Sequence, residues 1–495
     1  MPSIWRKKTI PQLLNETREH NKGLQRTLTA WSLIALGIGA VIGSGLFVST
    51  AAAIADDAGP SVTIAFFIAA LGCALSGFSY AELASAIPVS GSAYTYTYAT
   101  MGELLAWIIG WDLILEYAVG AATVAISWSQ YVNNLLVSVL HVSPIPYALS
   151  HSPFQHSVTG EQGFIDLPAL IIIILISLLL IKGTRESAAV NGIIVIIKVA
   201  IVIIIIATGW GFINPANHTP YIPPASTYVD EQGFAHNFGG IGGILAAAGT
   251  VFFAFIGFDA VSTTAQETIN PKRDMPIGIL GTLVFCAILY ILFGHVLSGL
   301  GSIKEFRTGG KEASVAFAIQ HYMPGYGWLA QMVTVALLAG FSSVILAMLM
   351  GQSRVFYAMG KDGLLPGYFA ALHPKFKTPY KANIAIMILV GLFAAFVPGT
   401  VVGHMSSIGT LFAFILVSVS VIILREKEPG LERQFRTPFV PYVPLLGIAF
   451  CAAMIYGLGW GNWLRLIVWL IIGIAIYFGY GRKHSKLQKT TDHEH

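Results

Sequence analysis

The pattern Gly43-Ser44-Gly45 lies in the middle of an apolar stretch that runs from about residue 31 to residue 55. Glycine costs a helix up to about 1 kcal/mol relative to alanine, so a continuous helix is disfavoured here. In hydrocarbon, the N–H and C=O groups freed by an interruption must be satisfied. The interruption therefore predicts a polar site, in which carbonyls that end one half-helix bind a cation and N–H groups that open the next bind an anion. The alternative is an uninterrupted helix that uses Gly39 and Gly43 as a packing face.

Lys198 is the second residue whose type and position could support chemistry. It lies about eight residues, or roughly 12 Å, inside another apolar stretch. A lysine at this depth costs at least about 2.5–3.5 kcal/mol on insertion scales, so it indicates a function. A lysine removed from water can exchange its proton near neutral pH. The alternative is a structural lysine paired permanently with an acid or with carbonyls.

The composition indicates an integral membrane protein. Of 495 residues, 55% are hydrophobic and only 11% are charged, whereas soluble proteins carry about 25% charged residues. Repeated apolar stretches of 18 residues or more favour helices over a barrel. Cys73, Cys286 and Cys451 are scattered and match neither a disulfide framework nor a metal site, and no cofactor is expected. The basic residues lie in loops, so the net charge of +4 does not predict a nucleic-acid partner.

The apolar stretches predict twelve membrane-spanning helices. Most Lys and Arg residues lie in the N-terminal segment, in the tail and in every second loop, so both termini are expected on the cytoplasmic side. The chain would then be a multi-pass protein of the cytoplasmic membrane, with lipid as its surroundings. The spans are predicted at 31–55, 61–87, 102–139, 164–182, 190–213, 240–266, 277–301, 327–359, 383–398, 403–424, 440–459 and 463–480.

The sixth span repeats the unusual feature of the first. Gly257 and Asp259 lie deep in its apolar sequence. Because five spans separate the two, the first and sixth spans start on opposite sides of the membrane. Interrupted helices at matching positions in two inverted halves predict an inverted repeat with a binding site near the membrane midplane.

Several motifs in order resemble the amino acid–polyamine–organocation superfamily: G-S-G-L-F (43–47), P-V-S-G-S-A-Y-T-Y-T-Y-A-T-M-G-E (88–103), G-W-D-L-I-L-E-Y (110–117), F-I-G-F-D (255–259), E-T-I-N-P-K-R-D-M-P (267–276) and S-R-V-F-Y-A-M-G-K-D-G-L-L-P (353–366). The details are most similar to the cationic amino acid transporter family, especially its bacterial, proton-coupled ApcT-type members. The resemblance implies an all-α LeuT-like fold with a five-plus-five inverted repeat. Its parts would be a cytoplasmic segment (1–30), two repeats (31–213 and 240–424), helices 11 and 12 (440–480) and a cytoplasmic tail (481–495).

The resemblance also implies an α-amino acid as substrate. The carboxylate would bind the N–H groups of Ser44 and Gly45, with Gly43 in the same substrate site, and the ammonium would bind the carbonyls of Val41 and Ile42. Further carbonyls are expected from the sixth span, at Phe253, Ala254 and Ile256. The Phe253 ring matches the family's aromatic gate, with a lipid-facing core position as the alternative.

Lys198 matches a fifth-span lysine that, in ApcT-type relatives, replaces the second sodium of LeuT. The motif A-G-F-S-S (339–343) implies that Ser342 and Ser343 face it. Glu116, in the third span, is the candidate acid for substrate recognition or proton coupling, with a structural acid as the alternative. Glu103, at a span end, is expected at the cytoplasmic interface.

The sequence therefore predicts a secondary transporter for proton-coupled symport of L-amino acids, cationic or small neutral. An enzyme is not expected, because no nucleophile–base pair or H-E-x-x-H metal cluster occurs. Two alternatives stay open: an exchanger without net proton coupling, and an amino acid receptor that does not transport. No protein partner is indicated.

Overall fold

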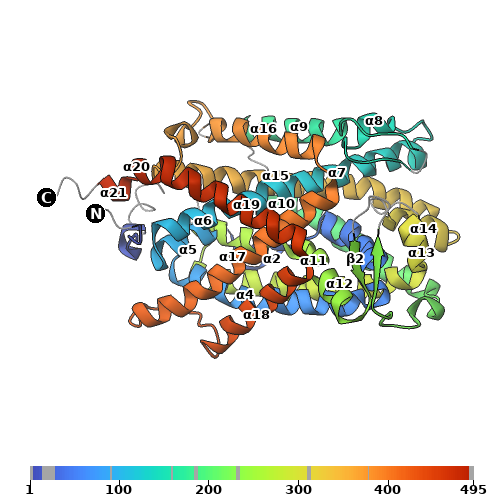
Figure 1. Ribbon diagram of the computed structural model, residues 1–495, viewed down its shortest axis with the longest axis horizontal. Coiled ribbons are helices and arrows are strands. Elements are labelled where there is room, and N and C mark those ends of the chain that lie inside the picture. Colours follow the sequence, from blue (N-terminus) through green and yellow to red (C-terminus); the bar gives the residue numbers. More distant parts are fainter. Residues whose placement is uncertain are drawn as a thin grey trace.

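The long apolar stretches form helices that run roughly side by side along the longest axis of the molecule (Figure 1). The computed structural model describes residues 4–13, 28–89, 92–157, 160–182, 188–229, 235–308, 314–376 and 378–489. Within these residues, eight helical segments are long and apolar enough to cross a membrane, and four shorter apolar helices accompany them. A mostly helical membrane protein is therefore confirmed. Parts of the predicted N-terminal segment and tail, at 1–3, 14–27 and 490–495, lie outside the described residues.

Labels with α mark α-helices, and labels with η mark 3₁₀ and π helices. The first half of the chain contains α2 (Ala30–Val41), η1 (Gly45–Ser49), α3 (Thr50–Ala52), η2 (Ala53–Ala58), η3 (Gly59–Ser61), α4 (Val62–Ala86), α5 (Ser92–Thr100), α6 (Glu103–Leu113), η4 (Ile114–Val119), α7 (Gly120–Asn134), η5 (Leu135–Val139), α8 (Tyr147–Ser150), α9 (Leu167–Lys182), α10 (Ala188–Gly209), η6 (Trp210–Phe212) and η7 (Pro215–His218).

The second half contains β1 (Ser226–Val229), β2 (Ala235–Phe238), α11 (Gly240–Phe252), η8 (Phe253–Phe255), η9 (Phe258–Glu267), α12 (Pro271–Leu300), α13 (Ile303–Thr308), α14 (Ser314–Tyr322), α15 (Gly327–Lys361), η11 (Gly367–Ala370), α16 (Tyr380–Phe396), α17 (Gly399–Lys427), α18 (Tyr442–Gly457), α19 (Trp460–Ile476), η12 (Tyr477–Gly481), α20 (Arg482–His484) and α21 (Lys486–Lys489).

Both predicted interruptions are present. In the first predicted span, α2 ends at Val41, and Ile42 follows in an extended conformation with ψ of 96°. Helical structure resumes with η1, which begins at Gly45. In the sixth span, η8 is followed by Ile256, with ψ of 135°, and by Gly257, with φ of +109°. Such a positive φ favours glycine, because a side chain would be strained there.

Five helical segments in the described part of the chain are π helices, namely η1, η2, η4, η5 and η12. A π turn pairs each N–H with the carbonyl five residues earlier, so it holds an additional residue compared with an α turn. The segment η1 follows the first interruption directly, and η4 lies in the middle of the third predicted span. These turns set the rotation of the helices that follow them.

A tight turn, rather than a loop, joins the first two predicted spans. The 3₁₀ turn η3 follows η2 directly and leads directly into α4. Gly59, its first residue, has φ of +57°, a conformation that glycine adopts readily. Helical structure therefore runs from residue 45 to residue 86, where the sequence predicted spans at 31–55 and 61–87 with a gap between them.

A small hairpin departs from the predicted all-α class. The strands β1 and β2 pair antiparallel, with Ser226 opposite Phe238 and Val229 opposite Ala235. The hairpin lies just before α11, and the Gly239 N–H after it donates to the Asp57 carbonyl oxygen of η2 at 2.7 Å. It therefore fastens the start of the sixth span to the outer part of the first.

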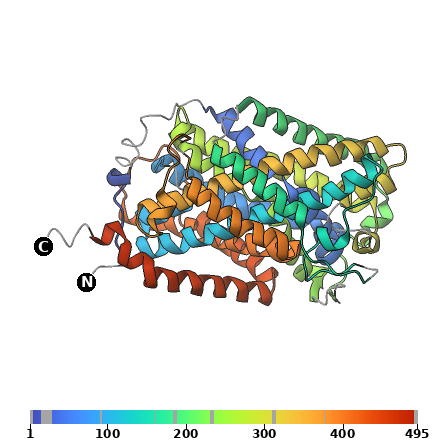
Figure 2. The same cartoon turned by 90° about the horizontal axis from the view of Figure 1, so that it is seen from above.

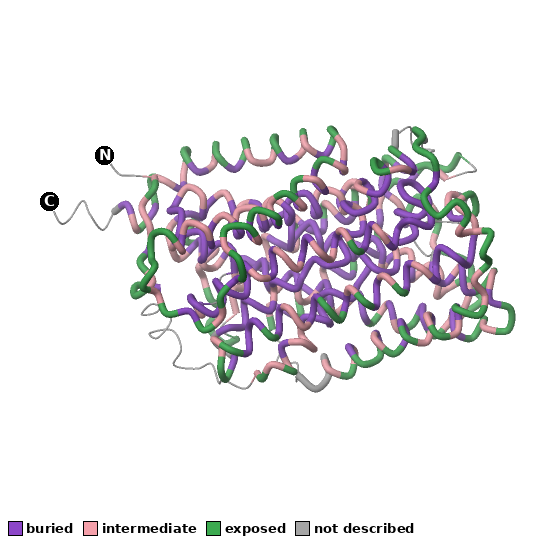
Figure 3. The backbone as a smooth tube through the Cα atoms, turned by 90° about the horizontal axis from the view of Figure 1, so that it is seen from below, coloured by how far each residue is buried: buried purple, intermediate pink, exposed green. Residues whose placement is uncertain are grey.

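Burial is concentrated in the middle of the bundle, and exposed residues lie along its outer helices and ends (Figure 3). The C-terminal helix α19 runs along one edge (Figure 2, red). Its exposed side chains are largely apolar, as Ile471 at 60% exposure illustrates, and so are those of α10, with Ile196 at 69%. Such faces suit contact with lipid, which is as apolar as these side chains.

A buried ion pair fastens one end of α4. Glu82 accepts hydrogen bonds from Arg425 Nε at 2.7 Å and Nη2 at 2.9 Å, at the end of α17. It also accepts the Thr437 N–H at 2.8 Å, and Arg433 Nε lies 3.2 Å from its carboxylate. Two parallel bonds from one guanidinium make this a geometrically specific contact.

Candidate functional site

The two interrupted helices meet at their interruptions. A Cβ atom added to Gly45 would overlap the backbone of Ala254 and would lie 2.9 Å from the Phe253 carbonyl carbon. Conversely, a Cβ atom added to Gly257 would lie 3.2 Å from the Ala40 carbonyl oxygen. Only a residue without a side chain leaves room for this crossing. The structure therefore brings predicted site residues of the first and sixth spans together.

Ser44 lies inside the first interruption with a free hydroxyl. The residue is 1% exposed, and its Oγ has no hydrogen-bond partner among the described residues. The first N–H groups of a helix, here those of Ser44 and Gly45, lack intrahelical partners. The same holds for the carbonyls of Val41, the last residue of α2, and of Ile42, which follows it. Buried polar groups are normally satisfied, so this cluster of donors and acceptors suits a small polar ligand.

The sixth-span residues form the opposite side of the same place. Phe253, Ala254 and Ile256 are all buried, and the Ile256 N–H donates to the Phe253 carbonyl oxygen at 3.3 Å. A carbonyl oxygen can accept a second hydrogen bond, so Phe253 keeps one acceptor position. Its ring is 5% exposed and lies in the protein interior rather than on the lipid-facing surface.

Lys198 reaches the first interrupted helix from α10. Its side chain is buried, at 1% exposure, and its Nζ donates to the Gly39 carbonyl oxygen at 3.0 Å and to Ser343 Oγ at 3.1 Å. Both acceptors are neutral. Gly39 lies two residues before the end of α2, so the lysine holds the carbonyl end of the interrupted helix directly.

Only one of the two predicted serines binds this lysine. Ser343 Oγ donates to the Gly340 carbonyl oxygen at 2.9 Å, which leaves its lone pairs for Lys198. Ser342 Oγ donates to the Leu338 carbonyl oxygen at 2.8 Å, and no hydrogen bond joins it to Lys198 in the described structure. Gly340 was not predicted from the sequence as part of this site, although a Cβ atom there would lie 2.7 Å from Lys198 Cε. That glycine makes room for the lysine stem.

Glu116 belongs to a buried polar cluster that adjoins the second interruption. It lies in η4, is fully buried and interacts electrostatically with Asp259 of η9. Asp259 Oδ2 accepts hydrogen bonds from the Tyr117 hydroxyl and, at 3.4 Å, from Ser92 Oγ. Neither Glu116 carboxylate oxygen has a hydrogen-bond partner among the described residues. The sequence analysis singled out the acids but missed Tyr117 and Ser92, which link them to the helices around.

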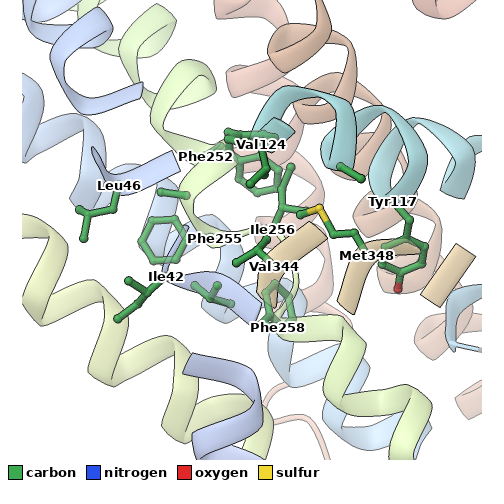
Figure 4. Packing of buried hydrophobic residues seen from close by; sticks show 14 of the residues in the cluster. Ile42, Leu46, Tyr117, Val124, Phe252, Phe255, Ile256, Phe258, Val344 and Met348 are labelled. Atoms are coloured by element: carbon green, nitrogen blue, oxygen red, sulfur yellow. The ribbon is translucent and has the colours of Figure 1, made fainter. Parts of the chain in front are cut away.

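The face of α15 beside the first interruption is apolar. A Cβ atom on Gly43 would lie 3.3 Å from Val344 Cγ2. Met348 follows one helical turn later, and its Sδ would lie 3.3 Å from a Cβ atom on Gly120 of α7. Figure 4 shows Val344 and Met348 in the same part of the core as Ile256. The side chain of a molecule bound at this interruption would therefore meet an apolar surface.

The chain is similar in sequence to known transport proteins over almost its whole length. The sequence pattern of the family described as "Amino acid permease" matches residues 28–481. The chain is 44% identical to the branched-chain amino acid permease BcaP of Bacillus subtilis, over 98% of this chain and 99% of that protein. It is 41% identical to the methylthioribose transporter of the same organism, over 99% and 100%. It is 28% identical to the vacuolar cationic amino acid transporter 4 of Arabidopsis thaliana, over the full length of both chains.

Proposed function

Because the chain belongs to the amino acid permease family, we propose that it carries an L-amino acid with an apolar side chain across the cell membrane together with a proton. The protein is a transporter and not an enzyme. Amino acid transport itself follows from the family. The proton coupling, the class of side chain and the topology are the proposed parts.

The observation that carries the proton coupling is the environment of Lys198. A buried ammonium with a carboxylate partner is held in place by its counter-charge, and separating the two is costly. Lys198 instead donates to a backbone carbonyl and a hydroxyl, at Gly39 and Ser343. It can therefore exchange its proton without breaking an ion pair. Because Gly39 lies on α2, the charge of the lysine acts on the helix end that bears the proposed ammonium acceptors.

Amino acid recognition rests on the backbone of both interruptions. The N–H groups at Ser44 and Gly45 suit a carboxylate, since a helix N-terminus favours negative charge. The carbonyls of Val41, Ile42 and Ala254 suit an ammonium. Backbone groups serve every amino acid alike, so the side chain must be selected elsewhere.

An apolar side chain fits the remaining surface best. Val344, one helical turn before Met348, packs beside Gly43, and apolar surface favours an apolar group. Cationic substrates would need an acid beside this surface, whereas the α15 side chains beside Gly43 and Gly120 are the apolar Val344 and Met348. The relatives named branched-chain amino acid permease, 44% and 32% identical, support the same class.

The proposed topology keeps twelve spans, a LeuT-like five-plus-five repeat and both termini in the cytoplasm. The N- and C-terminal ends lie at the same end of the bundle (Figure 1), as an even number of spans requires. The excess of Lys and Arg at this side supports its cytoplasmic orientation.

Uptake into proteoliposomes tests the proposal. Purified protein is reconstituted into empty vesicles and given labelled leucine, valine, arginine or methylthioribose, with and without an inward proton gradient. We expect accumulation of leucine and valine that depends on the gradient, and little of the other two. Uptake only into vesicles preloaded with amino acid would identify an exchanger. Preference for arginine would overturn the proposed side-chain class, and binding without uptake would identify a receptor.

A further inference from the structure

The two ends of the chain are fastened to one another and to the helix bundle. We call residues 4–13 the strap and residues 477–489 the tail. The strap is bound through its backbone, because the Glu103 and Leu104 N–H groups, which open α6, donate to the carbonyl oxygens of Arg6 at 2.9 Å and Ile4 at 3.1 Å. Arg6 Nη1 in turn donates to the Leu487 carbonyl oxygen of the tail at 3.2 Å. Both ends lie together in the ribbon view (Figure 1).

The tail is bound mainly through the side chain of Glu103, which is fully buried. Its carboxylate accepts hydrogen bonds from Tyr477 at 2.9 Å, Ser485 at 2.5 Å and Gln488 at 3.3 Å, all in the tail, and from Tyr98 of α5 at 3.0 Å. These four donors are neutral. Glu103 is the first residue of α6, so the positive end of the helix dipole also stabilises its charge.

A second contact joins the same elements to the end of α15. Asp362 Oδ1 lies 2.7 Å from Lys8 Nζ of the strap, and Asp362 Oδ2 accepts the Tyr94 hydroxyl of α5 at 2.6 Å. The Asp362 carbonyl oxygen accepts the Lys486 N–H of the tail at 3.0 Å. The strap is thus held on α6 and α15, and the tail binds the same two helix ends.

The strap precedes α2 in the chain, and α2 is the helix that carries Gly39 and the first interruption. A transporter has to open each end of its site in turn. At the end of the bundle where the strap and the tail bind α6 and α15, opening has to displace these two segments. We propose that the tail is a clamp that keeps the strap seated on α6 and α15, and that Glu103 is the positioning residue at which the clamp fastens. Release of the tail from Glu103 then precedes departure of the strap. This inference concerns access to the site and goes beyond the choice of substrate or coupling ion.

The test removes tail donors without touching the transport site. The double variant Ser485→Ala, Gln488→Ala loses two of the three tail donors to Glu103. Lys483→Ala is the matched control, because Lys483 is exposed in the same tail. Hydrogen–deuterium exchange is measured by mass spectrometry on the full chain in lipid nanodiscs. We expect at least tenfold faster exchange in residues 4–8 and at the Glu103 and Leu104 amides in the double variant, with no change in residues 239–243 and no change in the control.

Two outcomes would overturn the clamp. One is a strap that stays protected while the tail exchanges freely. The other is faster exchange spread evenly over the molecule, which is the result expected if the tail only stabilises the fold. Tyr477→Phe removes one hydroxyl with little change of shape and provides a milder variant, for which we expect a smaller change confined to the same amides. Initial uptake rates are compared in vesicles that contain equal amounts of folded protein. They are expected to differ at least threefold between the double variant and Lys483→Ala, and equal rates would refute the link between the clamp and transport.

Discussion

Gly45→Ala is the smallest perturbation of the crossing between the interrupted helices. The added methyl would overlap the Ala254 backbone, and neither a rotamer change nor a flexible side-chain end can relieve the overlap. Overpacking typically costs about 1–3 kcal/mol. If that strain separates the two halves of the site, affinity falls about 5- to 150-fold, since each 1.4 kcal/mol is about a factor of ten.

The assay is equilibrium binding of labelled leucine to purified protein, with the thermal transition recorded alongside. Gly242→Ala is the matched control, because Gly242 lies in α11 and nothing lies within 4 Å of a Cβ atom there. Gly43→Ala, whose nearest contact is a Val344 methyl at 3.3 Å, is expected to cost less than Gly45→Ala. Unchanged leucine affinity of a monodisperse Gly45→Ala protein would show that the crossing does not form the binding site.

Further predictions concern the lysine, its glycine neighbour, the substrate carboxylate and the ion pair of Glu82. Lys198→Met is expected to lose accumulation driven by a proton gradient in proteoliposomes while still binding leucine, and undiminished accumulation would remove Lys198 from the coupling. Lys198→Arg is expected to fail as well, because guanidinium stays protonated. Gly340→Ala should displace the lysine stem and lower the gradient-driven rate at least tenfold, with binding measured as the control; a wild-type rate would contradict the tight contact. Leucine methyl ester should not compete for binding, because a helix N-terminus favours an anion. Competition equal to that of leucine would contradict the binding of the substrate carboxylate at the helix N-terminus. Arg425→Met should lower the free energy of unfolding by up to about 3 kcal/mol, since among the described residues Glu82 then keeps only Arg433 as an ion-pair partner; an unchanged denaturation midpoint would show that the pair is not stabilising.

The sequence could predict the interruptions because their causes are local. Glycines at 43, 45 and 257 disfavour a helix wherever they occur in an apolar span. The depth of Lys198 could also be predicted from the apolar residues around it, whereas the serine pair is implied only by the resemblance of the motif at 339–343. What could not be predicted is which serine binds. Adjacent helical residues point about 100° apart, so the choice of Ser343 over Ser342 depends on the rotation of α15, which packing decides.

Other features depend on contacts between distant parts of the chain. The hydrogen bond from Tyr117 to Asp259 joins the third and sixth spans, and the bonds of the tail to Glu103 cross more than 370 residues. Neither leaves a local pattern. The π turns leave no local pattern either, since the residues of η4, Ile114–Val119, could equally form an α turn. The predicted roles of Glu116 and Phe253 stay predictions, while the structure adds where each lies.

The π turns have a consequence for how this chain tolerates length changes. Deleting one residue from η5, at the far end of α7, would convert a π turn into an α turn and shift only the connection that follows. The same deletion in η4 would also keep the rotation of α6 relative to α7, because an α turn covers about the same angle with one residue fewer. It would, however, move the side chains within the turn, so that Tyr117 would lose its hydrogen bond to Asp259. A scan of single-residue deletions along residues 103–139 is therefore expected to find tolerance at the η5 end and loss of function at η4.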